Sequence, residues 1–319
     1  MKADKLWQLG KSRLLGDLVA RLGRPEMALD RYAQALREAP EASAVYRRLA
    51  QVLRAHPETP AARAIDDQVP STLALFVGYP RSGHSLVGSL LDAHPQVALA
   101  HELNTLQRVA EGVSGDELLR FMKINAYFFA RLGRTWTGYD YQIPGQYQGR
   151  YTQLAVLGDK KGAGTARHLL RHPALLDELE ARSPAPLAFV HVVRHPLDNI
   201  ATWARRRRLS LALAAERYFE LADTVAALRA QRPGQMLDVH LADFTADPRT
   251  WLVELARFLG AAPPTEDYLE ACSALVFDAP RRSRDQVAWE PALLDWIRDR
   301  SAANDFLARY AAETDWEPA

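Results

Sequence analysis

The stretch Leu73-Ala-Leu-Phe-Val-Gly-Tyr-Pro-Arg-Ser-Gly-His-Ser-Leu-Val-Gly-Ser-Leu-Leu-Asp92 decides the fold class of this chain of 319 residues. Residues 73–77 form a short apolar run of the kind that makes a buried strand, and residues 85–92 carry apolar side chains at helical spacing. Gly78 and Gly83 bound the turn between them. A strand, a glycine-bounded turn and a helix, in this order, predict a loop whose backbone N–H groups wrap an anion.

The spacing Gly78-x4-Gly83-x-Ser85 is that of a P-loop, but the usual lysine is missing. Nucleoside triphosphatases place that lysine at the position of His84, whereas this chain carries its cation within the loop, as Arg81. Such a loop suits a 5′-phosphate with one further group better than a magnesium-bound triphosphate. We therefore predict an α/β fold, a P-loop NTPase-like parallel sheet flanked by helices. Its candidate cofactor-binding residues are Arg81, Ser82, Gly83, His84, Ser85 and Leu86.

A second strand and helix supply another anion site. The apolar run 187–193 reads as a strand, and Arg194 follows it at the carboxyl end, where open α/β sheets bind their ligands. Thr202 comes eight residues later, on a helix that Pro196 is suited to begin. A guanidinium fork beside a hydroxyl suits an isolated phosphate. Two phosphate sites on one sheet imply a nucleotide with phosphates at both its 5′ and 3′ positions.

These two motifs resemble those of sulfotransferases that use 3′-phosphoadenosine-5′-phosphosulfate (PAPS). The segment 78–86 is similar to the 5′-phosphosulfate loop of that family, and 194–202 is similar to its 3′-phosphate motif, with Thr202 where the family usually has Ser. The segment 81–102 especially resembles tyrosylprotein sulfotransferases and their bacterial relatives, and similarity extends from about residue 71 to the C-terminus. The resemblance implies transfer of a sulfuryl group from PAPS to a hydroxyl or amine acceptor, without a metal, and release of adenosine 3′,5′-bisphosphate.

The resemblance also implies catalytic residues. Glu102 falls at the position of the family's catalytic base, which takes the proton of the acceptor. Arg81, Lys160 and Ser283 are the candidates for stabilising negative charge on the sulfuryl oxygens and on the leaving phosphate, the last two by resemblance only. Between Lys160 and its neighbour Lys161 the choice stays open, although the resemblance favours Lys160.

Several residues depart from the family pattern. His84 stands where the family often has Thr, and His101 adjoins the expected base, so either imidazole could share base duty with Glu102. Leu241 replaces an aromatic residue that tyrosylprotein sulfotransferases place near the adenine. Asn104 replaces an arginine that the same branch uses for acidic peptides. The acceptor therefore stays open between a small molecule, a saccharide and a peptide.

Composition narrows the setting of the protein. The 40 basic and 39 acidic residues balance, so no global charge attracts nucleic acid or a membrane. The single cysteine, Cys272, rules out an internal disulfide and a cysteine-based zinc site. No apolar stretch approaches the length of a membrane span, and the N-terminus lacks a signal-peptide core. These features predict a cytoplasmic enzyme.

The chain divides into a helical segment with a linker, residues 1–68, and a PAPS-binding sulfotransferase domain, residues 69–319. Positions in the first segment fit a tetratricopeptide repeat of two antiparallel helices, and a truncated second copy begins near Ala44. One repeat cannot bury its own face. We expect it to dock on the larger domain, to form a homodimer or to bind a protein partner. The positions that fit the repeat are Leu15, Gly16, Ala28, Tyr32, Ala35 and Pro40.

Two further segments permit more than one reading. The aromatic stretch 136–147 forms either a wall of the acceptor pocket or loop anchors packed on the core. The run Arg205–Arg208 reads first as a solvated helix face, then as a guard of the nucleotide entrance, and only third as a nucleic-acid contact.

Two other functions compete with sulfuryl transfer. A divergent P-loop kinase would bind magnesium-ATP and needs a carboxylate after a strand to hold the metal, for which Asp159 is the tempting candidate. A non-catalytic interaction protein would use its helical repeat and keep an inactive nucleotide fold. In that case, replacement of Glu102 would change no activity.

Overall fold

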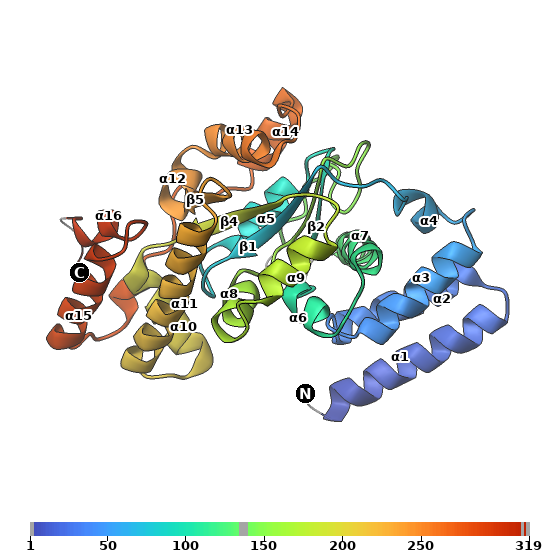
Figure 1. Cartoon of the computed structure of the whole chain (residues 1–319), viewed down its shortest axis with the longest axis horizontal. Coiled ribbons are helices and arrows are strands. Elements are labelled where there is room, and N and C mark those ends of the chain that lie inside the picture. The colour runs from blue at the N-terminus through green and yellow to red at the C-terminus, as the bar shows by residue number, and fades with distance from the viewer. Residues whose placement is uncertain (1–2, 134–139, 314–315, 317–319) are drawn as a thin grey trace.

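A computed structural model describes residues 3–133, 140–313 and 316 of the chain. Its centre is a parallel sheet with the strand order β2-β3-β1-β4-β5 (Figure 1). This arrangement confirms the predicted α/β fold with a parallel sheet. The strands are β1 (Thr72–Val77), β2 (Val97–Ala100), β3 (Val156–Asp159), β4 (Leu187–Val193) and β5 (Met236–His240).

Strand β1 shows why the sheet is buried on both faces. Its side chains alternate, so Leu73, Leu75 and Val77 enter one hydrophobic cluster while Ala74 and Phe76 enter a second one. The first cluster also contains residues of α7, α8, α10 and α11, and the second contains residues of α5, α13 and α14. Helices therefore cover both faces of the sheet, as is usual for parallel sheets.

The helices of this layered body alternate with the strands and follow them along the chain (Figure 1). They are α5 (His84–Leu91), α6 (Thr105–Ala110), α7 (Gly115–Arg131), α8 (Gly162–Arg171), α9 (Leu175–Arg182), α10 (Pro196–Arg207), α11 (Leu211–Gln231), α12 (Leu241–Ala246), α13 (Pro248–Leu259), α14 (Glu266–Ser273), the 3-10 turn η2 (Arg284–Gln286), α15 (Pro291–Ala302) and α16 (Ala308–Ala311). Within the described ranges, no helix is both long and apolar enough to cross a membrane.

The strand register brings several loops to one edge of the sheet. Val77, the last residue of β1, pairs with His191 near the end of β4, and Asp159 at the end of β3 pairs with Ala100 at the end of β2. Because all these strands run in parallel, the segments that follow them leave the sheet on the same side. Those segments carry the predicted anion-binding and catalytic residues.

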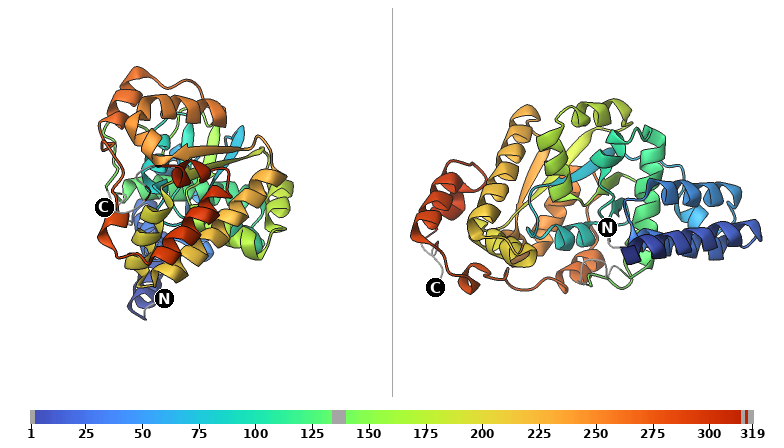
Figure 2. Two further views of the ribbon diagram at one scale, coloured as in Figure 1. Left: turned by 90° about the vertical axis from the view of Figure 1, so that its left-hand side faces the viewer. Right: turned by 90° about the horizontal axis from the view of Figure 1, so that it is seen from below.

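Four helices precede the sheet, namely α1 (Ala3–Arg21), α2 (Pro25–Glu38), α3 (Ser43–Ala55) and α4 (Pro60–Ala64). They lie at one end of the molecule, and the C-terminal helices α15 and α16 lie at the other (Figures 1 and 2). Gly16 lets α1 approach α2 closely, since a Cβ atom at this position would come within 2.7 Å of the Tyr32 ring. Tyr32 also donates a hydrogen bond of 2.6 Å to Asp17.

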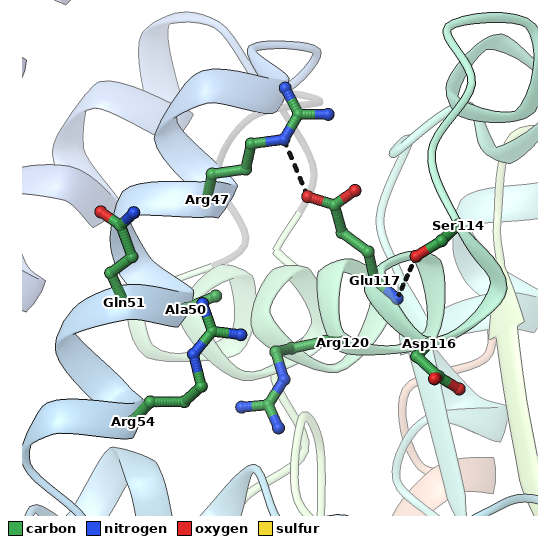
Figure 3. Close-up of a pocket in the computed structure, with 8 residues that line it drawn as sticks. All are labelled: Arg47, Ala50, Gln51, Arg54, Ser114, Asp116, Glu117 and Arg120. Atoms are coloured by element: carbon green, nitrogen blue, oxygen red, sulfur yellow. Dashed lines mark hydrogen bonds and ion pairs between the residues drawn. The ribbon is translucent and has the colours of Figure 1, made fainter.

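The N-terminal helices dock on the larger domain through α3 and α7. The rings of Tyr46 and Phe121 stack with their centroids 5.0 Å apart, and Asn125 Nδ2 donates to the Tyr46 hydroxyl at 2.7 Å. At the rim, Arg47 pairs with Glu117 at 2.8 Å, beside a pocket of about 400 Å³ (Figure 3). One continuous hydrophobic cluster runs from α2 and α3 to the sheet. Docking was one of the predicted outcomes, whereas the repeat family and the boundary at residue 68 stay predictions.

The predicted linker is more ordered than its polar sequence indicates. It contains the short helix α4, and its last residues are bonded to the body of the domain. Lys123 Nζ donates to the carbonyl oxygens of Asp66 and Gln68 at 2.8 and 2.5 Å, and the Tyr151 hydroxyl donates to Asp66 at 2.8 Å. These bonds hold the segment against α7 before the chain enters β1.

Candidate active site

A cleft of about 490 Å³ lies at the carboxyl edge of the sheet, and it gathers most of the predicted site residues. The loop after β1, the segments after β2, β3 and β4, and the second half of α10 all contribute to its walls. The predicted residues that line it are Arg81, Gly83, His84, Ser85, Leu86, Glu102, Lys160, Arg194 and Thr202. Ser82 and Ser283 do not line it and are buried.

The loop after β1 has the backbone of an anion-binding turn. Gly78 and Gly83 have φ angles of +136° and +106°, which glycine adopts without strain. Gly83 caps α5, whose first N–H groups have no partner within the helix and lie at the positive end of its dipole. A Cβ atom on Gly83 would come within 2.7 Å of the Leu241 side chain, so glycine is also required for close packing.

Left-handed backbone conformations gather at this cleft. Arg81, Glu102 and Asn104 have φ angles of +72°, +59° and +63°. Such angles are uncommon for residues with a side chain, and each stores about 1–3 kcal/mol of strain. The one other described non-glycine residue with positive φ, Arg208, ends α10. Strain of this kind persists where the surrounding structure enforces it, which is frequent at functional sites.

Glu102 is held between two lysines. Its Oε1 atom lies 3.3 Å from Lys160 Nζ, and its Oε2 atom lies 2.7 Å from Lys161 Nζ. Burial alone would raise the pKa of Glu102, but the positive charges of Lys160 and Lys161 outweigh it and hold that pKa well below its usual range. Glu102 is therefore a carboxylate at neutral pH. Both candidate lysines contact it.

Lys160 is fixed from several sides. Its ammonium donates to Ser85 Oγ at 3.1 Å and lies 3.3 Å from His101 Nε2, while Gly88 leaves room for its stem. An ammonium group can only donate, so His101 Nε2 accepts and carries no proton. The ring of His101 stacks on Phe129 with centroids 3.7 Å apart. The Phe129 ring thus positions His101, and His101 in turn helps to hold the Lys160 ammonium group in place.

His84 is buried and directed into the protein. Its Nε2 atom lies 3.2 Å from the Val77 carbonyl oxygen and therefore donates to it. Burial lowers the pKa of His84 to about 3, even though the bond to Val77 acts in the opposite direction. Gly162 leaves space for the imidazole, because a Cβ atom there would come within 2.4 Å of the ring. The neutral ring thus fixes the start of α5 to β1.

The predicted 3′-phosphate residues gather around Arg194. Its guanidinium lies 3.3 Å from Thr202 Oγ1 and 3.3 Å from Ser283 Oγ, and the two hydroxyl oxygens are 2.9 Å apart. The same guanidinium donates to the carbonyl oxygens of Arg81 and Arg281. Arg194 thereby connects the loop after β1 with the segment that carries Ser283.

Ser283, whose role in stabilising the sulfuryl group stays a prediction, lies beside Arg194 and Thr202. Its hydrogen bonds join it to Arg194 and Thr202 and not to Glu102 or Lys160. Asp198 fixes this segment, since its carboxylate accepts from the backbone N–H of Arg284 at 2.9 Å and from its guanidinium at 3.2 Å. Ser283 therefore contacts the two residues for which 3′-phosphate binding was predicted.

Ser82 supports the loop from within. Its hydroxyl donates to the Tyr79 carbonyl oxygen and accepts from Asn199 Nδ2, both at 2.9 Å. Beneath the loop, the Tyr79 hydroxyl lies 2.9 Å from His191 Nε2, and His191 Nδ1 lies 2.9 Å from Asp238. The sequence pattern gave no signal for this buried polar chain, because its members come from three separate elements.

Asp159 has a structural role. It is fully buried, and its carboxylate accepts from the N–H groups of Leu103 and Thr105 at 3.2 and 2.9 Å and from the Thr105 hydroxyl at 2.9 Å. These bonds hold the segment that carries Glu102. Among residues 3–133, 140–313 and 316, no three His, Cys, Asp or Glu side chains gather as a metal site.

The cleft also contains residues that the sequence analysis did not identify as site residues, or named only as one of several alternatives. Tyr141, from the aromatic stretch, lines the cleft, whereas Trp136 lies outside the described residues. Arg207, from the arginine run, also lines it. The remaining members that carry aromatic or charged groups are Lys161, Arg167, Trp203, Phe277 and Arg281.

The parallel sheet and the glycine-bounded loop after β1 give the chain a P-loop-like fold. The sequence model described as "Sulfotransferase family" matches residues 74–266, which is more than half of the chain. The chain therefore belongs to the sulfotransferase family. No curated protein matches it.

Solved sulfotransferase structures are similar to the chain at low identity. The sulfotransferase domain of the Synechococcus PCC 7002 olefin synthase is 19% identical with a TM-score of 0.41, over 72% of this chain and 84% of that one. Sulfotransferase STF1 from Mycobacterium tuberculosis H37Rv is 14% identical with a TM-score of 0.44, over 95% and 99%. Mouse sulfotransferase SULT7A1 complexed with PAP is 12% identical with a TM-score of 0.40, over 79% and 92%. At these values the comparisons carry no argument on donor or acceptor.

Proposed function

We propose that the protein transfers a sulfuryl group from PAPS to a hydroxyl or amine acceptor and releases adenosine 3′,5′-bisphosphate. The observation that supports the proposal is that two separate groups of cationic and hydroxyl side chains meet at one cleft. The loop from Arg81 to Ser85 with the start of α5 forms the first, and Arg194 with Thr202 and Ser283 forms the second. A nucleotide with phosphates at both its 5′ and 3′ positions would engage both.

The residues present fit such a donor. Gly78 and Gly83 adopt the positive φ angles that an anion-binding turn uses, and Arg81 and Lys160 supply positive charge in the cleft. Arg194 offers a planar fork between two hydroxyl groups, which suits a single phosphate. PAPS supplies a sulfuryl group on a phosphate leaving group, so the cleft must stabilise negative charge at both.

Glu102 is the proposed general base. His84 donates its Nε2 proton to Val77, and His101 accepts at Nε2 from Lys160, which leaves Glu102 as the carboxylate exposed to the cleft. Its side chain is 39% exposed, so an acceptor can reach it. Anionic groups that enter the cleft would draw Lys160 and Lys161 away from Glu102. The pKa of Glu102 would then rise toward the range in which a carboxylate is a useful base.

The alternative functions have less support. The kinase reading assigned metal binding to Asp159, but this carboxylate is buried and engaged by Leu103 and Thr105. The hypothesis of a non-catalytic interaction protein does not explain why the carboxylate of Glu102 is held between two lysines in the cleft. A cytoplasmic location and a homodimer or protein partner bound through the N-terminal helices stay predictions.

Calorimetric titration with adenosine 3′,5′-bisphosphate, magnesium-ATP and AMP tests the proposal. We expect tight binding of the bisphosphate alone, followed by transfer of label from PAPS when acceptors are screened. Preference for magnesium-ATP would instead support the kinase. Binding of none of the three would leave the non-catalytic reading.

A further inference from the structure

A group of arginines continues the cleft away from the nucleotide clusters. Arg167 on α8 and Arg207 at the end of α10 line the cleft. Arg171 lies one turn beyond Arg167 on the same face of α8. Arg217 lies on α11, which packs against both α8 and α10 (Figure 1). We call these four residues the arginine cluster.

The arginine cluster has no carboxylate partner within the part of the chain that the structure describes. Its one specific contact is that of the Arg167 guanidinium with the Trp203 ring, 5.7 Å from the ring centroid. Arginines nearby behave differently, because Arg232 pairs with Asp177 at 2.9 Å and Arg182 pairs with Glu178 at 2.9 Å. Among the described residues, the four members of the cluster therefore lack the counter-charge that Arg232 and Arg182 have.

The members of the cluster repel one another. Burial lowers the pKa of Arg167, and the positive charges of Arg207, Arg171 and Arg217 lower it further. A half-buried cation beside three others destabilises the protein unless an anion binds there. The nucleotide already has its own cations, Arg81 at the loop and Arg194 at the second cluster.

We infer that the arginine cluster binds an anionic group of the acceptor, so the acceptor carries a phosphate, sulfate or carboxylate besides the group that is sulfated. This inference rests on the proposed function. Guanidinium groups bind such anions in bidentate fashion, and the buried Trp203 ring supports the guanidinium of Arg167.

The geometry also gives the spacing within the acceptor. Helix α8 begins at Gly162, which lines the cleft together with Glu102. At about 1.5 Å of rise per residue, Arg167 and Arg171 lie roughly 8 and 14 Å along the helix from that point. An acceptor that reaches from Glu102 to the cluster therefore has to span that length of α8 in addition to the step from Glu102 to Gly162.

Binding of a heparin-derived tetrasaccharide, measured by calorimetry in low salt with saturating adenosine 3′,5′-bisphosphate, tests the inference. The uncharged maltotetraose serves as the control ligand. We expect the wild type to bind the sulfated probe alone, and Arg171→Gln/Arg217→Gln to bind it about tenfold more weakly or worse. Arg63→Gln is the matched control variant, since Arg63 is an exposed arginine on α4, at the N-terminal end of the molecule.

Failure of the wild type to bind the tetrasaccharide would overturn the inference, and so would an equal loss of tetrasaccharide affinity in Arg63→Gln. A parallel loss of bisphosphate affinity in the double variant would also overturn it, because the cluster would then bind the nucleotide. Tighter binding of an oligothymidylate of matched charge than of the tetrasaccharide would likewise overturn the inference, because the cluster would then be a nucleic-acid site. If the wild type fails to bind the bisphosphate, the proposed function is wrong. A tetrasaccharide titration without nucleotide then still measures whether the arginine cluster binds anions.

Discussion

The carboxylate of Glu102 accepts a hydrogen bond of 2.7 Å from Lys161 Nζ. Lys160, the preceding residue, reaches the other carboxylate oxygen at 3.3 Å. The side chains of two adjacent residues at the end of β3 thus converge on one carboxylate. This pairing keeps Glu102 ionised and keeps both ammonium groups at the site where negative charge is expected to develop during transfer.

Replacement of Lys161 by methionine should move the acidic limb of the pH–rate profile to higher pH. The two lysines hold the pKa of Glu102 below its usual range, and the base must be ionised to act. Loss of one cation raises that pKa, so activity is lost sooner as the pH falls. Lys161→Arg keeps the charge and should keep the profile. If the acidic limb does not shift in Lys161→Met, Glu102 is not the group whose ionisation limits the rate at low pH.

Glu102→Gln should leave the affinity for adenosine 3′,5′-bisphosphate nearly unchanged and reduce turnover by roughly 10²–10⁴-fold, the usual contribution of a positioned base. Glutamine keeps the size of the side chain but cannot take a proton. Calorimetry and turnover with labelled PAPS measure the two quantities on the same protein. Full activity would move the base role to one of the two histidines.

Arg194→Ala should abolish discrimination between adenosine 3′,5′-bisphosphate and AMP. The guanidinium lies between Thr202 and Ser283, where only a 3′-phosphate is expected to bind. Loss of charged hydrogen bonds should weaken bisphosphate binding by roughly 10²-fold and AMP binding far less. Equal losses for both nucleotides, measured by calorimetry, would contradict the assignment of this cluster.

Ser283→Ala separates the role implied by resemblance from the place that the structure gives this residue. Its hydroxyl lies 2.9 Å from Thr202 Oγ1 and 3.3 Å from the Arg194 guanidinium. We therefore expect weaker binding of the bisphosphate, by about three- to tenfold, with nearly normal turnover at saturating PAPS. A large loss of turnover at unchanged affinity would return Ser283 to the sulfuryl group.

Local patterns carried most of what the sequence could predict. Apolar runs and two glycines between residues 73 and 92 predict a strand, a loop and a helix, and the structure has β1 and α5 there. The strand that ends at Val193 and the helix that Pro196 begins were predicted for the same reason. Parallel strands then bring their carboxyl ends together without further information.

Long-range contacts could not be predicted in this way. Ser283 joins Arg194 across 89 residues, from a segment without periodicity, and no spacing rule locates it. Arg167 and Arg171 look like an ordinary solvated helix face until α10 and α11 are placed beside them. The polar sequence before β1 reads as a free linker, because its bonds to Lys123 and Tyr151 involve backbone and distant side chains.

The contact between α3 and α7 gives a last prediction, on stability. Tyr46 is fully buried, stacks on Phe121 and accepts a hydrogen bond from Asn125. Removal of an aromatic side chain from such a position destabilises a protein by about 3–5 kcal/mol. Tyr147, which is 37% exposed, is the matched control, and Tyr147→Ala should change stability little.

Tyr46→Ala should lower the temperature of a single unfolding transition, measured by calorimetry and by circular dichroism. The reason is the continuous cluster of apolar side chains that joins α2 and α3 to the sheet, so the helical layer and the sheet lose packing together. Bisphosphate should raise the transition temperature of the variant as it does for the wild type, because the cleft is untouched. Two separate transitions, with the ligand-sensitive one unmoved, would show instead that the N-terminal helices unfold independently of the sheet.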